Sequence, residues 1–174
     1  MRKVLIAVIG GRSCAGAGDE AVADAVGREI ARRGAVLVCG GLGGVMQAAC
    51  RGATAEGGLT VGLLPGDDPS DANHFVDVAI PTGIGYARNF LVASAAQGII
   101  AIGGSIGTLS EMSFALVKGL PVAAIGSWEL DRERLPDGAL FFAAANPAEA
   151  ADYVFRHLRA HPNNHRGGDT QRCK

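Results

Sequence analysis

The amino-acid sequence predicts a Rossmann-like α/β domain in which a mainly parallel sheet lies between two layers of helices. Short apolar runs alternate with segments of helical periodicity along most of the chain. The runs are continuously apolar, as expected for strands buried on both faces of a sheet. Glycine-rich loops follow three of these runs. Together these observations predict a three-layer α/β/α architecture with right-handed crossovers.

The N-terminal half begins with an apolar, β-branched run at 4–9, which predicts the first strand. The first helix follows, with Asp19 as its N-cap. Gly34 ends this helix, because glycine accepts the left-handed conformation common at helix C-termini. The next predicted elements are a strand at 35–39, a helix at 45–56 and a strand at 59–64.

The C-terminal half continues the alternation after a polar, loop-like segment at 67–73. Apolar runs predict further strands at 75–80, 98–102 and 121–125. The spacing of apolar residues predicts further helices at 86–96, 108–118 and 147–159. Gly119 suits the end of the middle helix, and Pro147 suits the first turn of the last one.

Length and composition indicate one globular domain. The chain has 174 residues and a formal net charge of -1, with hydrophobic residues at 48% and charged residues at 19%. We expect a single domain at 1–160 and a flexible polar tail at 161–174. The basic residues form no stripe, which argues against a nucleic-acid partner. No apolar stretch reaches membrane-spanning length, so we expect no membrane partner and a cytoplasmic location.

The cysteine and histidine residues predict no metal site. The cysteines form no C-x-x-C pair, and they are Cys14, Cys39, Cys50 and Cys173. We expect them to be small buried hydrophobic residues in a reducing compartment. The helical spacing of His157, His161 and His165 is interrupted by Pro162, and no acidic or cysteine partner is near in sequence. These histidines are interpreted as part of a solvated tail.

The glycine-rich loops predict a binding site for a small phosphorylated ligand. Each loop follows a predicted strand and opens toward a helix, so all three meet at the carboxyl edge of the sheet. Helix N-termini present unpaired N–H groups, and glycine lets the backbone approach an anion closely. The residues predicted to bind phosphate or nucleotide are Gly10, Gly11, Gly40, Gly41, Gly43, Gly44, Gly103, Gly104, Ser105, Gly107 and Thr108.

These loops do not match the dinucleotide or triphosphate motifs. The first strand lacks a following G-x-G-x-x-G, and the second strand ends at Cys39 and Gly40 rather than at an acidic residue. The loop at Gly104 is not followed by the Gly-Lys-Ser/Thr of a Walker A motif. The sequence therefore favours a mononucleotide-like ligand over NAD or ATP with magnesium. We expect that the protein requires no cofactor.

Two charged residues stand at loop–helix junctions on the same predicted edge. The planar fork of Arg88 suits a phosphate or a carboxylate, and the carboxyl group of Glu111 suits acid–base chemistry. Structural roles explain both residues equally well. Arg88 would then form a surface salt bridge, and Glu111 would offset the dipole of its helix.

The residues around these two positions resemble those of a known superfamily. Residues 87–90 read ARNF, and residues 103–111 read GGSIGTLSE. Residues 39–65 read CGGLGGVMQAACRGATAEGGLTVGLLP. These blocks resemble the LOG-like proteins, once described as lysine decarboxylases, whose pattern is P-G-G-x-G-T-x-x-E with an upstream arginine. The pairs Arg88-Asn89 and Ser110-Glu111 look closest to the branch that includes the molybdenum cofactor carrier proteins.

The resemblance implies a nucleotide site, and LOG enzymes hydrolyse the N-glycosidic bond of nucleoside 5′-monophosphates. It implies that Gly104, Gly107 and Thr108 hold the phosphate, with Arg88 and Glu111 as the catalytic pair. The sequence departs from the pattern at Asn89, Gly103, Ser105 and Ser110. Backbone N–H groups would still bind phosphate after these changes, whereas the charge set around the sugar is thinner.

Three functions remain open on this evidence. The first is a phosphoribohydrolase acting on nucleoside 5′-monophosphates. The second is a non-catalytic carrier of a phosphorylated cofactor such as the molybdenum cofactor. The third, a nucleic-acid processing module, is disfavoured by the scattered basic residues. The resemblance also implies a homo-oligomer, a dimer or tetramer, through small apolar faces that equally suit the core: Ala93, Ala95, Ala96, Phe114, Ala115 and Val117.

Overall fold

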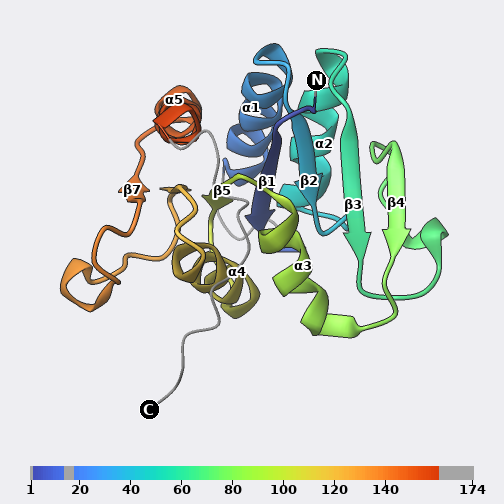
Figure 1. Ribbon diagram of the computed structural model, residues 1–174. Coiled ribbons are helices and arrows are strands. Elements are labelled where there is room, and N and C mark those ends of the chain that lie inside the picture. The colour runs from blue at the N-terminus through green and yellow to red at the C-terminus, as the bar shows by residue number, and fades with distance from the viewer. Residues whose placement is uncertain (1, 14–17, 161–174) are drawn as a thin grey trace.

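The computed structural model describes residues 2–13 and 18–160, with side chains to 158, and it contains the predicted Rossmann-like sheet (Figure 1). Seven strands pair in the order β4-β3-β2-β1-β5-β6-β7, and every pairing is parallel. The strands are β1 (Leu5–Gly10), β2 (Val36–Cys39), β3 (Thr60–Leu64), β4 (Val78–Pro81), β5 (Gly98–Ile102), β6 (Val122–Ile125) and β7 (Phe141–Ala143).

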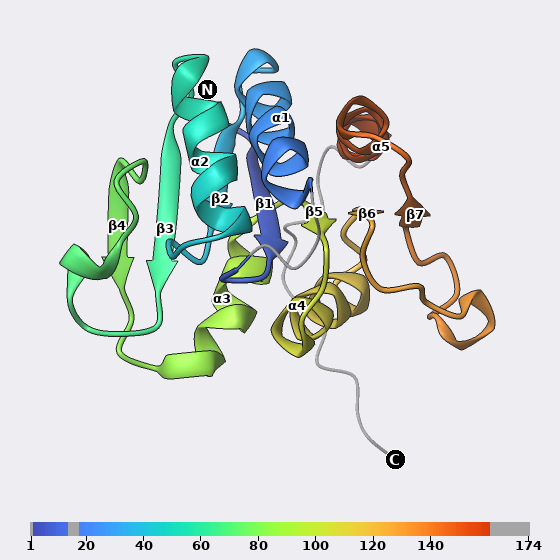
Figure 2. The same cartoon turned by 180° about the vertical axis from the view of Figure 1, so that it is seen from behind.

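Helices cover both faces of this sheet, as the two opposite views show (Figures 1 and 2). One layer contains α1 (Asp19–Arg32), α2 (Val45–Ala55) and α5 (Pro147–Ala160). The other contains α3 (Arg88–Ala95) and α4 (Ile106–Val117). The three-layer α/β/α prediction is therefore confirmed.

Successive strand residues enter different hydrophobic cores, because side chains alternate across a sheet. In β1, Ile6 and Val8 pack into the core beneath α1, α2 and α5. Ala7 and Ile9 pack into the core beneath α3 and α4. All four side chains are buried, which explains why the run is continuously apolar.

Three predicted boundaries were wrong, and local hydrogen bonds account for two of them. Asp19 is the first residue of α1, and Gly18 takes the N-cap position. Helix α4 begins at Ile106 because the Ser105 hydroxyl accepts a hydrogen bond from the Thr108 N–H at 3.4 Å and caps the helix. The strand predicted at 75–80 is shorter, because the Thr60 hydroxyl donates to the Phe75 carbonyl at 2.7 Å and thereby holds this segment off the ladder.

The remaining differences are small. Residues 85–87 form a 3₁₀ turn, so the helix predicted from residue 86 begins at Arg88. The short strand β7 was not predicted, since only three residues form it. Cys39 and Cys50 are free and buried, as predicted. Cys14, Cys173, His161, His165 and the tail predicted at 161–174 lie outside the described residues.

The described residues lack two features, a membrane-spanning helix and a metal-binding cluster. No helix in this part of the chain is long and apolar enough to cross a membrane. No group of three or more histidine, cysteine, aspartate or glutamate side chains in these same residues is arranged to hold a metal ion.

Candidate functional site

The candidate site lies where the strand order of the sheet reverses. From β1 the chain builds outward through β2, β3 and β4, then returns to place β5 on the other side of β1. The connections after β1 and β5 therefore diverge, which opens a crevice at the carboxyl ends of these strands. A cavity of about 960 Å³ occupies this position, lined by Val8, Ile9, Gly10, Arg12, Gly40, Met46, 86–90, 105–108, Ser110, Glu111 and Phe114.

The N-terminus of α4 forms one wall of the cavity. Ser105 and Thr108 make a reciprocal capping box, in which each side chain bonds the other residue's backbone N–H. The Ser105 carbonyl also accepts a hydrogen bond from the Trp128 indole N–H at 3.1 Å. Ile106 and Gly107 line the cavity within the first turn. This wall therefore combines first-turn N–H groups with the positive end of the helix dipole, an arrangement that suits an anion.

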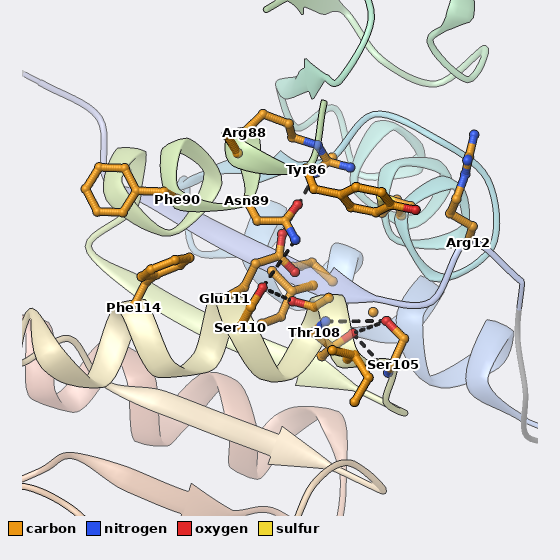
Figure 3. A pocket seen from close by; sticks show the side chains of 18 residues that line it. Arg12, Tyr86, Arg88, Asn89, Phe90, Ser105, Thr108, Ser110, Glu111 and Phe114 are labelled. Atoms are coloured by element: carbon orange, nitrogen blue, oxygen red, sulfur yellow. Dashed lines mark hydrogen bonds and ion pairs between the residues drawn. The ribbon is translucent and has the colours of Figure 1, made fainter. Parts of the chain in front are cut away.

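Arg88, from the start of α3, extends its side chain into the cavity (Figure 3). The residue is only 8% exposed. Its guanidinium lies against Gly40, where any Cβ would overlap Nη1. Burial lowers the pKa of Arg88, and Glu111 partly offsets that effect. The Nε atom is buried, and no described residue accepts a hydrogen bond from it.

Glu111 faces Arg88 from the second turn of α4. Its Oε1 atom is 3.9 Å from Nη1 of Arg88, which is longer than a hydrogen bond. The residue is 6% exposed, and burial raises the pKa of its carboxyl group to about 8, although Arg88 opposes the shift. Glu111 is therefore largely protonated at pH 7, and it is the only acidic residue among the described residues that line the cavity.

A neutral hydrogen-bonded chain links α3 to α4 beside this pair. The Asn89 side-chain amide donates to the Ser110 hydroxyl at 3.3 Å, and that hydroxyl donates to the Gly107 carbonyl at 2.7 Å. These are two of the positions at which the sequence departs from the LOG pattern. Asn89 and Ser110 are neutral, so neither of these two positions adds a charge beside Arg88 and Glu111.

Aromatic and basic side chains complete the rim, and the sequence did not single them out. Tyr86 lines the cavity although it is 89% exposed. Phe90 and Phe114 form an edge-to-face pair across α3 and α4, with ring centroids 5.3 Å apart. Arg12 follows β1 and lines the cavity too. The position of Arg12 after a strand, in a glycine-rich loop, could have predicted it as a site residue. No sequence feature predicts that the aromatic residues line the cavity.

The structure brings seven of the predicted site residues to the cavity wall: Gly10, Gly40, Arg88, Ser105, Gly107, Thr108 and Glu111. The other six do not line it: Gly11, Gly41, Gly43, Gly44, Gly103 and Gly104. Several of these serve packing instead. Any Cβ on Gly44 would lie 2.5 Å from the Arg12 carbonyl, and one on Gly104 would lie 2.8 Å from Trp128 Nε1. The polar segment at 67–73 and Trp128 also lie off the cavity wall.

The sequence matches a family model at residues 3–151, described as the SLOG cluster4 family. The chain belongs to this family. A protein of Archaeoglobus fulgidus, itself uncharacterized, is 41% identical over 128 residues, which are 72% of this chain and 82% of that protein. The predicted resemblance to LOG-like proteins is thus confirmed.

Two solved structures resemble this SLOG cluster4 protein over nearly their full lengths. The molybdenum cofactor binding protein of Rippkaea orientalis is 32% identical, with a TM-score of 0.80 over 94% of this chain and 99% of that one. The Moco carrier protein of Chlamydomonas reinhardtii is 33% identical, with a TM-score of 0.82 over 91% and 99%. Both support the predicted closeness to the carrier branch.

Proposed function

We propose that this chain binds and carries a phosphorylated pterin cofactor of the molybdenum cofactor type, in the cavity between α3 and α4. One observation carries the proposal. The cavity joins a helix N-terminus to a buried guanidinium that lacks an acceptor for its Nε, while its acidic lining residue, Glu111, is held largely protonated. Such a wall attracts an anionic ligand. Of the two solved structures that resemble this chain, one is a molybdenum cofactor binding protein and the other is a Moco carrier protein.

The residues present fit such a ligand at both of its ends. The α4 N-terminus, with Ser105 and Thr108, would bind the phosphate through backbone N–H groups and hydroxyls. Arg12, exposed at the rim, would add a positive charge to that end. Apolar side chains such as Ile9 and Met46 line the wall where a flat ring would lie.

The chemistry of the cavity supports binding without turnover. Hydrolysis of a glycosidic bond needs an acid for the leaving group and usually a second carboxylate to activate water. Protonated Glu111 meets the first need. No second carboxylate lines the described cavity, because Ser110 and Asn89 are neutral.

A nucleoside 5′-monophosphate phosphoribohydrolase is the second candidate, and the position of Glu111 favours it. A buried, protonated carboxyl group opposite an arginine is suited to general acid catalysis. Chromatography of the free base after incubation with a panel of nucleoside 5′-monophosphates distinguishes the two. Base release by the wild type and not by Glu111→Gln would establish the hydrolase and refute the carrier role.

The carrier proposal is tested by loading the protein with molybdenum cofactor and measuring retained pterin fluorescence after gel filtration and denaturation. Thr108→Val should lower retention about tenfold, because the valine cannot bond the phosphate. Ser113→Ala, on the exposed side of the same helix, is the matched control and should retain the cofactor normally. Equal retention by all three proteins, or none by the wild type, would contradict the proposal.

We propose further that copies of the chain associate through the outer surface of α3 and α4. Three of the small residues expected there, Ala93, Ala96 and Ala115, are instead buried in the core. Large apolar side chains remain exposed, including Val117 at 80% and Ile106 at 73%. Light scattering should find a dimer or larger, and Val117→Glu should shift it toward monomer. A monomeric wild type would refute this association.

A further inference from the structure

The Arg88 side chain is held differently from Arg28 and Arg51, which are half-buried arginines among the described residues. Arg51 and Arg28 place their Nε atoms 2.9 Å and 2.8 Å from the Asp24 carboxylate. Arg88 is more deeply buried, yet no described residue accepts from its Nε, and its nearest acid is 3.9 Å away. Burying a cation without hydrogen bonds is costly. An arginine serving only to stabilise the fold would be held as Arg51 and Arg28 are.

Glu111 does not supply the missing acceptor. Its carboxyl group is largely protonated at pH 7, so the two side chains form no full ion pair. The separation of 3.9 Å is too long for a hydrogen bond, so the N–H groups of Arg88, whose side chain lines the cavity, are not bonded to that carboxyl group (Figure 3). These N–H groups are therefore a donor set for a ligand.

The surroundings of Arg88 limit the shape of that ligand. The guanidinium rests on Gly40, where the absence of a Cβ fixes how closely it lies to the backbone. Tyr86, Phe90, Val8 and Ile9 line the same cavity, so aromatic and apolar side chains make up much of its wall. Such a slot suits a flat heterocycle that stacks on aromatic groups and presents an acceptor edge to the arginine.

Two parallel N–H donors match one particular edge of a fused ring. Arginine bonds the O6 and N7 acceptors of guanine in this bidentate way. An oxidised pterin ring has the same edge, the C4 oxo oxygen beside the unprotonated ring nitrogen N5. Adenine has an amino group in place of the oxo oxygen, so a hydrogen-bond donor of adenine would face an N–H donor of Arg88.

We infer that Arg88 is a specificity-determining residue that selects fused heterocycles with an oxo oxygen beside a ring nitrogen, as in pterin, guanine and hypoxanthine, and rejects adenine. This inference rests on the proposed function, since the ring is expected to be tethered to a phosphate held at the α4 N-terminus. It extends the proposed function by assigning recognition of the ring to one side chain.

Titration calorimetry on the full chain, with ligand-detected NMR for weak binders, tests the inference. The probes are IMP, AMP, ribose 5-phosphate and 6-hydroxymethylpterin phosphate. IMP and AMP differ at the group that Arg88 would contact, and IMP should bind about tenfold more tightly or better. A pterin phosphate that binds more tightly than IMP would identify the pterin as the natural ring, and the reverse order would identify a purine nucleotide.

Arg88→Lys keeps the charge but removes the bidentate fork, so it should reduce the preference for IMP over AMP to within about threefold. Its affinity for ribose 5-phosphate should not change. Arg134→Met, whose side chain is 87% exposed and off the cavity wall, is the control. Equal binding of IMP and AMP by the wild type, or an undiminished preference in Arg88→Lys, would overturn the inference alone. Failure of the wild type to bind any probe, ribose 5-phosphate included, would overturn the proposed function too.

Discussion

The two helical layers cover one sheet in different ways. In the α1–α2 layer, Gly27 and Gly52 bring the helices into backbone contact, since any Cβ there would overlap the Ala49 or Asp24 carbonyl oxygen. In the α3–α4 layer, the helices diverge around a cavity that contains Arg88 and Glu111. The first layer is packed for stability. The second layer leaves polar groups unmatched, as functional sites commonly do.

The charged groups of the two layers show the same contrast, because those of the α1–α2 layer are paired and the buried charge of the α3–α4 layer is not. On the outer side of α1 and α2, the Asp24 carboxylate is bonded by both Arg28 and Arg51, and Glu56 is bonded by Arg28 and Arg32. In the cavity, the buried Arg88 has only an acid that is mostly neutral. The charged groups near solvent on α1 and α2 therefore have ion-pair partners within the chain, whereas the buried guanidinium of Arg88 remains available to a ligand.

The largest expected effect tests the close packing of α1 on α2. Gly52→Ala should lower the free energy of unfolding by more than about 4 kcal/mol, because the new methyl group meets backbone that cannot move without separating the helices. Chemical denaturation measures this. Gly83→Ala is the control, since its site is open and only its positive φ of 65° is strained, at about 1 kcal/mol. Similar losses for both variants would show that the helix contact is looser than described.

The next effect concerns Glu111 and pH. Burial raises the pKa of this carboxyl group from 4.5 to about 8, so the folded state binds its proton more tightly than the unfolded state. The stabilisation is complete below pH 4.5 and is lost as pH rises to about 8. Glu111→Gln cannot ionise, so its stability relative to the wild type should rise by roughly 2–4 kcal/mol between pH 5 and pH 9. Parallel pH profiles for the two proteins would contradict the assigned pKa.

A smaller effect of opposite sign is expected from Arg88→Met. Methionine removes a buried, unsatisfied cation while filling a similar volume, so the free energy of unfolding should increase by about 1–2 kcal/mol at pH 7. Thermal and urea denaturation without ligand measure it. A destabilised variant would mean that Arg88 supports the fold and that the contrast between the two layers is weaker than inferred.

The smallest effect is expected at the ion pairs of the stable layer. Asp24→Asn weakens the bonds to Arg28 and Arg51 while preserving shape. Because these pairs are partly exposed to solvent, the loss should be about 0.5–1 kcal/mol and should shrink in high salt. A loss above that range, unaffected by salt, would show that the network is integral to the α1–α2 contact.

Much of the fold followed from local patterns. The strands at the centre of the sheet are continuously apolar because both faces are covered, and β5 was predicted with its observed bounds. Predictions failed where one side chain redirected the backbone. Thr60 bonds the Phe75 carbonyl and shortens a strand, and Ser105 caps α4 earlier than expected. Such contacts depend on spatial neighbours that the sequence pattern does not specify.

For the site, the sequence by itself determined the chemical types and the edge on which they gather. Glycine-rich turns after parallel strands place Gly40, Ser105, Thr108, Arg88 and Glu111 at one edge, since the carboxyl ends of parallel strands coincide. Only the tertiary structure decided which glycines face the cavity and which face helix or loop backbone. It also decided the protonation of Glu111, because desolvation depends on every element packed around a group and not on the group's own segment.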